Sequence, residues 1–197
     1  MESFNAAEQK KIESYIINNH KIKLYGIVLC LYTGLRLGEL LALEWADIDF
    51  LKSTITVTKN SRDAWENGEY VKIIDTPKTA TSRREIPLPR QLVPYLRILK
   101  HQNRRGFVIS GKDGKPVSLR SYQKALQSTL KILNIPHRGF HALRHTFATR
   151  ALECGMDVKT LSEILGHKNS SITLNRYAHS FEEHKTAMMN RVGRLLK

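Results

Sequence analysis

Two arginines stand where a guanidinium can leave the packing and face a ligand. Arg36 follows Thr33-Gly34 at a predicted helix boundary, and Arg144 lies one helical turn after His141, near the start of another predicted helix. Backbone N–H groups at that helix N-terminus also favour an anion. Two arginines can hold two oxygens of a phosphate through forked hydrogen bonds, which lysine cannot do with the same geometry. These residue types suit metal-free cleavage of a phosphodiester, which needs cations, a nucleophile, a base and an acid.

Two other patterns come close to known sites but lack an essential residue. The run from Gly106 to Asp113 is one residue short of a phosphate-binding loop, because Asp113 stands where a Ser or Thr should hold magnesium, and its centre is an apolar, strand-like stretch. His141 and His145 have zinc-ligand spacing, but position 142 is Ala, where a metalloprotease has Glu, and no third ligand is near in sequence. The sequence therefore predicts no nucleotide hydrolysis, no metal and no cofactor.

The charge of the chain is concentrated in its middle third. The 197 residues carry 32 Lys+Arg and 18 Asp+Glu, a net charge of +14, and residues 78–144 hold 15 basic and 2 acidic side chains. A segment this basic repels itself unless a polyanion faces it, and nucleic acid is the commonest such partner. The candidate DNA contacts in this segment are Arg83, Arg84, Lys112, Lys115, Arg120 and Arg138.

Composition and cysteine content predict a cytoplasmic protein. With 41% apolar and 25% charged residues, the chain has the composition of an ordinary globular domain. Its two cysteines, Cys30 and Cys154, form no C-x-x-C pair, which favours a reducing compartment. The longest apolar stretch, residues 24–35, falls short of the ~20 residues needed to span a bilayer, so no membrane role is expected.

The elements that must position these side chains follow from the apolar pattern. Helical spacing predicts helices over residues 6–19, 21–33, 36–41, 92–102, 119–133, 141–154, 158–165, 172–178 and 181–196. Alternation predicts three strands, Thr54–Lys59, Tyr70–Ile74 and Arg84–Leu88, in one antiparallel sheet. Gly34, Gly155 and Gly166 are predicted helix ends, and Asp157 a predicted N-cap. The expected fold class is α+β, mostly helical, with a small three-stranded antiparallel sheet on its edge.

Five segments in a fixed order carry a recognisable set of residues. They are Thr33-Gly-Leu-Arg-Leu-Gly-Glu-Leu40, Thr76-Pro-Lys-Thr79 with Ser82-Arg-Arg-Glu-Ile-Pro-Leu88, His141-Ala-Leu-Arg-His-Thr-Phe-Ala-Thr149, Leu165-Gly-His167 and Arg176-Tyr-Ala-His179. Together they resemble the catalytic domain of the tyrosine recombinases, or phage-type integrases, and the resemblance runs from about residue 5 to about residue 190. Any one segment is a weak signal, but the ordered set is specific.

The resemblance implies a role for each matching residue. Arg36 and Arg144 would clamp the scissile phosphate, and His167 would donate to a non-bridging oxygen. His141 would be general acid and base for the nucleophile Tyr177. Lys78 would protonate the departing 5′ oxygen, and Glu39 would support Arg36. A phenol has a pKa of ~10 and needs such a base at neutral pH. The implied activity is site-specific recombination of double-stranded DNA through a 3′-phosphotyrosyl intermediate.

The resemblance also predicts how the chain is organised. Residues 1–180 would form the catalytic domain, and an apolar stripe in the tail 181–197 would dock on a neighbouring protomer, with self-association, a tetramer in the family's synapses, expected only on DNA. Family members carry core-binding and arm-binding domains ahead of the catalytic one, and we expect this chain to lack them. Weak, salt-sensitive DNA binding with little sequence preference would follow.

Two alternatives remain open from the sequence. Residues 148–176 also fit a helix-turn-helix, with Gly155 at the turn and residues 158–165 as one helix, which would make the chain a DNA-binding protein without catalysis. A type IB topoisomerase-like enzyme would share the nucleophile and the arginine clamp but would relax DNA. Strand exchange between two duplexes separates that enzyme from a recombinase.

Overall fold

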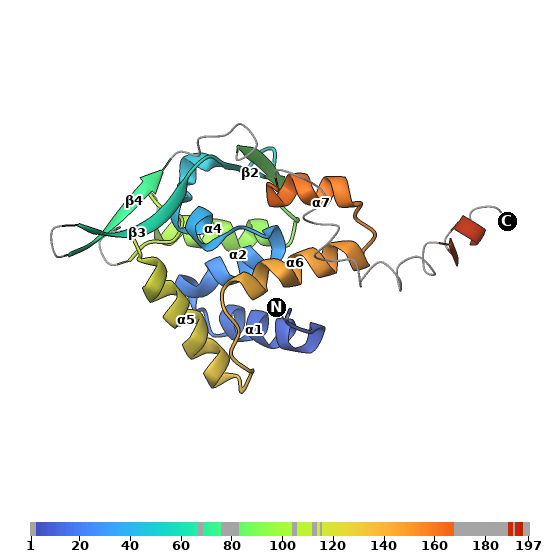
Figure 1. Cartoon of the computed structure of the whole chain (residues 1–197), viewed down its shortest axis with the longest axis horizontal. Helices are drawn as coiled ribbons and strands as arrows, with labels where there is room; N and C mark the ends of the chain where they lie inside the picture. The colour runs from blue at the N-terminus through green and yellow to red at the C-terminus, as the bar shows by residue number, and fades with distance from the viewer. Residues whose placement is uncertain are drawn as a thin grey trace.

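The chain folds around a buried helix. A computed structural model describes residues 3–66, 69–75, 83–103, 106–111, 114, 116–167, 189–190 and 192–194. Helix α2 (Tyr25–Thr33) is buried on nearly every side because its sequence, Tyr-Gly-Ile-Val-Leu-Cys-Leu-Tyr-Thr, offers no charged face to water. It packs against α1 (Ala6–Asn18), α4 (Leu92–Gln102) and α6 (His141–Glu153), and it lies between these helices in Figure 1.

The remaining helices complete the body around this core. They are α3 (Leu37–Ala42), α5 (Leu119–Ile132) and α7 (Val158–Leu165), with short 3₁₀ turns at Ile22–Leu24 and Trp45–Asp47. The predicted helices therefore form where the sequence places them, except that residues 21–33 begin with a 3₁₀ turn. The predicted helix at 172–178 lies outside the described residues, as does most of that at 181–196.

The strands differ in pairing from the sequence prediction. The structure has a three-stranded antiparallel sheet in the order β1 (Ile48–Asp49), β2 (Thr54–Val57), β5 (Arg84–Pro87), with Ile55 opposite both Ile48 and Ile86. A separate hairpin pairs β3 (Asn60–Glu66) with β4 (Glu69–Asp75). The predicted strand at residues 70–74 thus forms, but not in the three-stranded sheet. Strand β3 escaped prediction because its polar sequence, Asn-Ser-Arg-Asp-Ala-Trp-Glu, reads as a turn.

The hairpin and the small sheet lie along one side of the helical body (Figure 1), α3 packs against β3, and α7 packs against β5. The predicted class, α+β and mostly helical with a small antiparallel sheet, is confirmed. Within the described part of the chain, no helix is both long enough and apolar enough to cross a bilayer.

The helix ends are set by local sequence as predicted. Gly34 ends α2 and Gly166 ends α7, both with left-handed φ values, 66° and 65°, which glycine adopts without steric penalty. The Asp157 carboxylate accepts the backbone N–H of Thr160 at 2.9 Å and caps α7. The two glycine ends matter because Gly34 lies two positions before Arg36 and Gly166 directly precedes His167.

Candidate active site

Three chain segments far apart in sequence meet at one place in the fold. The first is the turn from Gly34 to Arg36, between α2 and α3. The second is the first turn of α6, which carries His141 and Arg144. The third is the end of α7, from Ile164 to His167. Four of the predicted catalytic residues, Arg36, His141, Arg144 and His167, therefore lie on adjoining segments.

Arg144 ties two of these segments to its own helix. Its Nη1 donates to the Gly34 carbonyl at 2.8 Å, and its Nη2 donates to the Leu165 carbonyl at 2.6 Å. The Nη2 atom also lies 2.9 Å from His167 Nε2. A guanidinium cannot accept a hydrogen bond, so this contact requires an unprotonated Nε2 and places the imidazole proton on Nδ1. Arg144 is 5% exposed, so its orientation is fixed by the protein.

Arg36 stands at the N-cap of α3 and is held by Glu39 one turn later. Arg36 Nη1 pairs with Glu39 Oε1 at 2.8 Å, and the backbone N–H of Arg36 donates to Oε2 at 2.8 Å. Arg36 Nη2 lies 3.5 Å from the Gly166 carbonyl, at the end of α7. With 37% of its side chain exposed against 7% for Glu39, Arg36 keeps donors available to a ligand. The predicted support of Arg36 by Glu39 is present as a direct contact.

Glu39 also binds a second arginine that arrives from the sheet. Arg84 on β5 donates from Nη1 and Nη2 to the two carboxylate oxygens at 3.0 and 2.8 Å. Burial by itself would raise the pKa of Glu39, but the hydrogen bonds and charges of Arg84 and Arg36 outweigh it and lower that pKa to about 2. Glu39 is therefore a carboxylate throughout the physiological pH range.

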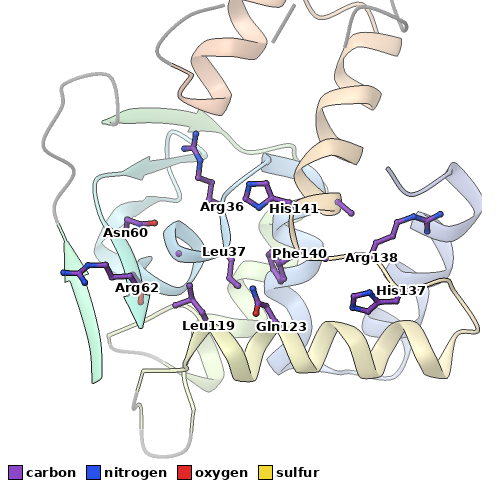
Figure 2. A pocket seen from close by; sticks show the side chains of 14 residues that line it. Arg36, Leu37, Asn60, Arg62, Leu119, Gln123, His137, Arg138, Phe140 and His141 are labelled. Atoms are coloured by element: carbon purple, nitrogen blue, oxygen red, sulfur yellow. The ribbon is translucent and has the colours of Figure 1, made fainter. Parts of the chain in front are cut away.

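His141 lies at the edge of a pocket that opens beside Arg36. The pocket has a volume of about 760 Å³, and Figure 2 shows Arg36 and His141 near one another at one side of it, with Leu119 and Gln123 at another. Its walls combine basic, amide and apolar groups, contributed by Arg36, Leu37, Gly38, Asn60, Ser61, Arg62, Leu119, Gln123, His137, Arg138, Gly139, Phe140, His141 and Ala142. Such a cationic pocket suits part of a polyanion.

The histidine pair on α6 and the extended stretch after Gly106 have structural roles in the described residues. His145 is 6% exposed and its ring lies 6.3 Å from that of His141, edge to face. Val108 donates its backbone N–H to the Leu43 carbonyl, and Phe107 forms a bridge with Glu44, so the stretch after Gly106 pairs as extended chain. Among the described residues, no three His, Cys, Asp or Glu side chains are grouped as metal ligands.

The predicted DNA contacts fall into four groups. Arg83 and Arg120 are exposed. Arg84 is a correction, because its side chain is only 6% exposed and its donors bind Glu39 and the Ile164 carbonyl, so it cannot contact DNA directly. Arg138 pairs with Glu8 at 3.0 Å and stacks over Phe4, yet also lines the pocket. Two predicted DNA contacts, Lys112 and Lys115, lie outside the described residues. The predicted catalytic residues Lys78 and Tyr177 also lie outside them.

Several pocket residues were not singled out from the sequence. Asn60 and Arg62 come from β3, whose polar sequence carries no strand signal, and Gln123 lies on the exposed side of α5. His137 and Arg138 lie just before α6. For His137, the only sequence signal of a place in the pocket is its closeness to the motif that begins at His141. Arg138 was predicted from charge alone.

The fold is a mostly helical domain with a small antiparallel sheet, and its candidate site is a cluster of arginines and histidines. Both features fit the domain family that the sequence matches. A sequence profile described as the phage integrase family matches residues 2–184. The chain belongs to that family.

Named relatives agree with this assignment. The chain is 36% identical to a XerC-like tyrosine recombinase of Caldanaerobacter subterraneus, over 94% of this chain and 52% of the relative. It is 29% identical to the transposase of transposon Tn916 from Enterococcus faecalis, over 85% of this chain and 45% of the relative. The chain thus spans about half the length of these two relatives.

Solved structures show the same fold. The integrase of transposon Tn1549, residues 82–397, in complex with transposon right end DNA, superposes with a TM-score of 0.80 at 30% identity, covering 97% of this chain and 66% of that one. The XerA recombinase has a TM-score of 0.74 at 22% identity, over 94% of this chain and 62% of its own, and supports the fold alone.

Proposed function

We propose that this chain is the catalytic part of a site-specific recombinase that cuts and rejoins the DNA of a mobile element. The observation that carries the proposal is the convergence of Arg36, His141, Arg144 and His167 from segments separated by up to 131 positions in the sequence. The name of the Tn916 relative and the DNA complex of the Tn1549 integrase support both the DNA substrate and the mobile-element context.

In the proposed reaction, the Tyr177 hydroxyl oxygen attacks the phosphorus of a DNA phosphodiester. A bond forms between that oxygen and phosphorus, and the bond from phosphorus to the 5′ oxygen breaks. His141 accepts the phenol proton, because an un-ionised phenol is a weak nucleophile at neutral pH. Lys78 donates a proton to the departing 5′ oxygen. The products are a 3′-phosphotyrosyl bond and a free 5′ hydroxyl.

The cationic groups stabilise the charge that builds on the phosphate. Arg36 binds one non-bridging oxygen from the exposed edge of its guanidinium. Arg144 adds a positive charge that the protein holds in a fixed orientation. His167 donates a hydrogen bond from its protonated ring nitrogen to a non-bridging oxygen. Preorganised donors of this kind are a major source of catalysis in water-poor sites. Attack by the 5′ hydroxyl of another strand reverses the step, so the exchange conserves bond energy and requires neither a nucleotide cofactor nor a metal.

Duplex DNA is the proposed partner, and self-association on DNA is a further part of the proposal. The net charge of +14 supports binding that weakens steeply with salt, because neutralised phosphates release counterions. The predicted boundary between a catalytic domain at 1–180 and a docking tail at 181–197 lies outside the described residues, as does most of the tail. Deleting residues 181–197 is expected to abolish assembly on DNA, and assembly that persists would refute the docking role. A cytoplasmic site of action is part of the proposal, because the named relatives come from bacteria, whose DNA lies in the cytoplasm.

The decisive experiment is a covalent-capture assay. The protein is incubated in EDTA with a nicked suicide DNA substrate, and denaturing gels are examined for a protein–DNA adduct. We expect an adduct with the natural chain and with Tyr95→Phe, and none with Tyr177→Phe. Tyr95 is a partly buried tyrosine on α4 whose ring meets that of Tyr25 edge to face, and it does not line the pocket beside Arg36.

The same assay separates the alternatives. DNA binding with no adduct from the folded natural chain would refute the proposal and favour the helix-turn-helix interpretation. An adduct that leads to relaxation of supercoiled DNA, without strand exchange between two duplexes, would favour a topoisomerase-like enzyme. Support for the recombinase proposal over the helix-turn-helix comes from Arg144 on α6, which binds the Leu165 carbonyl at the end of α7 and so links this helix pair to the candidate site.

A further inference from the structure

Arg84 binds two other elements of the fold, although its position in a basic segment suggests a surface residue. Its Nε donates to the Ile164 carbonyl at 2.6 Å, while Nη1 and Nη2 bind the two oxygens of Glu39. One planar guanidinium therefore connects β5, α3 and α7, and all three of its donor nitrogens have protein acceptors.

Each of these contacts leads directly to a proposed catalytic residue. Glu39 also binds the Arg36 guanidinium and its backbone N–H. Ile164 lies three positions before His167. Gly166 packs so closely that a Cβ there would be 3.0 Å from Arg84 Nη1. Arg84 thus contacts Glu39, which holds Arg36, and it lies against Gly166, the residue directly before His167.

We propose that Arg84 is the positioning residue that fixes Arg36 and His167 relative to one another. This inference rests on the proposed function for its catalytic meaning. The forked geometry is essential, because an ammonium is a point charge that cannot serve a bidentate carboxylate and a carbonyl on another helix in one plane. Arg84 acts through Glu39 and the end of α7 and has no direct access to DNA.

The charge of Arg84 also decides how Glu39 is shared. Within the described residues, two charged groups face Glu39, Arg36 from its own turn and Arg84 from β5. The buried Cys30 thiol on α2 interacts electrostatically with Glu39 and with Arg144 on α6 at longer range. Without Arg84, both oxygens of Glu39 are left to Arg36. The exposed arginine would then turn towards the protein and away from the phosphate.

The test compares Arg84→Met and Arg84→Lys with Arg97→Met, a change at an exposed arginine on α4. Adduct formation is followed in a single turnover at saturating suicide DNA, alongside NMR signals of the His167 ring and the Arg36 guanidinium in the DNA-free protein. We expect Arg84→Met to slow adduct formation about 10- to 100-fold, since a misplacement of about 1 Å at a reacting group can cost on the order of 10²-fold, and to shift both signals. Arg84→Lys should restore little of the rate, and Arg97→Met should match the natural chain.

A double variant separates positioning from a general loss of stability. If Arg84 acts through Glu39, then Glu39→Gln combined with Arg84→Met should be no slower than the slower single variant, since coupled residues are not additive. Multiplying effects would contradict the proposal. So would unshifted His167 and Arg36 signals in Arg84→Lys, which is the fallback if Arg84→Met does not fold.

The two possible failures are distinguishable. A natural chain that forms no adduct refutes the proposed function, while the NMR comparison still decides whether Arg84 positions Arg36 and His167. A natural chain that forms an adduct at the same rate as Arg84→Met refutes the positioning role and leaves the proposed function intact.

Discussion

Arg144 and His167, 23 positions apart, meet with Nη2 and Nε2 separated by 2.9 Å. The contact exists because α6 and α7 are joined by a short turn and because Arg144 also binds the carbonyls of Gly34 and Leu165. Arg144 therefore holds three segments together, and in the proposed reaction it also supplies positive charge to the phosphate. A change at Arg144 should affect both stability and chemistry.

Replacing Arg144 with lysine should show both effects. The charge remains, but one ammonium cannot meet both carbonyls and His167 with the geometry of the fork. We expect the free energy of unfolding in urea to fall by about 1–3 kcal/mol, since buried carbonyls lose donors. Adduct formation in EDTA should fall by about 10²- to 10³-fold, as for loss of an oriented donor.

Arg150 on the same helix provides the matched control for this change. It pairs with Glu153 and its side chain is 33% exposed. Arg150→Lys should change the unfolding free energy by less than about 1 kcal/mol and leave adduct formation unaltered. Equal losses for the two lysine variants would show that Arg144 has no special role.

The shared carboxylate of Glu39 makes stability depend on pH. The pKa of Glu39 is about 2 in the folded chain and 4.5 for the free side chain, so the ionised form is favoured by folding. Its contribution is complete above about pH 4.5 and is lost as the pH falls towards 2, by about 3 kcal/mol in total. Urea unfolding measured between pH 6 and pH 2.5 should show this decline.

Glu39→Gln isolates that contribution from those of other carboxyls. The pKa values of Glu8, Asp49 and Asp157 are also lowered in the folded chain, and these groups are the same in both proteins. The variant should be less stable at pH 6, because Arg84 is left buried without its counter-charge. The difference between the two proteins should narrow as the pH falls, and parallel curves would contradict the assignment.

The sequence predicts the helices well because their apolar faces are buried. Helices α4 and α7 form with the predicted bounds, and Gly34, Gly166 and Asp157 act as predicted. Strand pairing is different, because it depends on partners distant in the chain. Residues 84–87 pair with β2, whereas residues 69–75 pair with β3, whose polar sequence carries no strand signal.

Site residues that belong to a sequence motif could be predicted. Residues whose role depends on whether the side chain is buried could not be predicted as well. Arg83 and Arg84 are adjacent arginines in the same basic segment, yet one is exposed and the other binds Glu39. Counting charges cannot separate them. The alternation of the strand could have done so, because Arg84 lies two positions from the buried Ile86 and therefore on the same face of the sheet.

Gly34 should tolerate no side chain. Its φ is 66°, and an added Cβ would lie 2.6 Å from the Phe147 ring and 2.7 Å from Leu165. Its carbonyl also accepts from Arg144. Gly34→Ala should therefore lower the unfolding free energy by more than the ~1–2 kcal/mol of a left-handed alanine and abolish adduct formation.

Gly106→Ala is the control for backbone strain alone. Gly106 has a φ of 73° and no atom within 4 Å of an added Cβ. The variant should lose only about 1–2 kcal/mol and keep its activity. Thermal or urea unfolding of both variants measures the difference, and similar losses would mean that the packing around Gly34 relaxes freely.

Two side chains of the site helix bond to Phe4 in the N-terminal segment, the buried Thr146 hydroxyl and, at 3.4 Å, the Arg150 guanidinium. Thr146 Oγ1 accepts the backbone N–H of Phe4 at 2.8 Å and donates to the Ala142 carbonyl at 2.8 Å. Thr129 on α5 is also buried, but its hydroxyl makes only the local bond to Ala125. Thr146→Val leaves the Phe4 N–H without its acceptor, so we expect a loss of about 1–3 kcal/mol in unfolding free energy.

Thr129→Val should cost less than about 1 kcal/mol, because a helical threonine gains little from its bond to the preceding turn. Amide hydrogen exchange at Phe4 should accelerate in Thr146→Val and stay unchanged in Thr129→Val. Unchanged protection at Phe4 in Thr146→Val would mean that packing alone seats the segment, since Phe4 is fully buried and Arg138 stacks on its ring. Faster exchange would instead identify the Thr146 hydroxyl as the group that fixes α1 against the helix carrying His141 and Arg144.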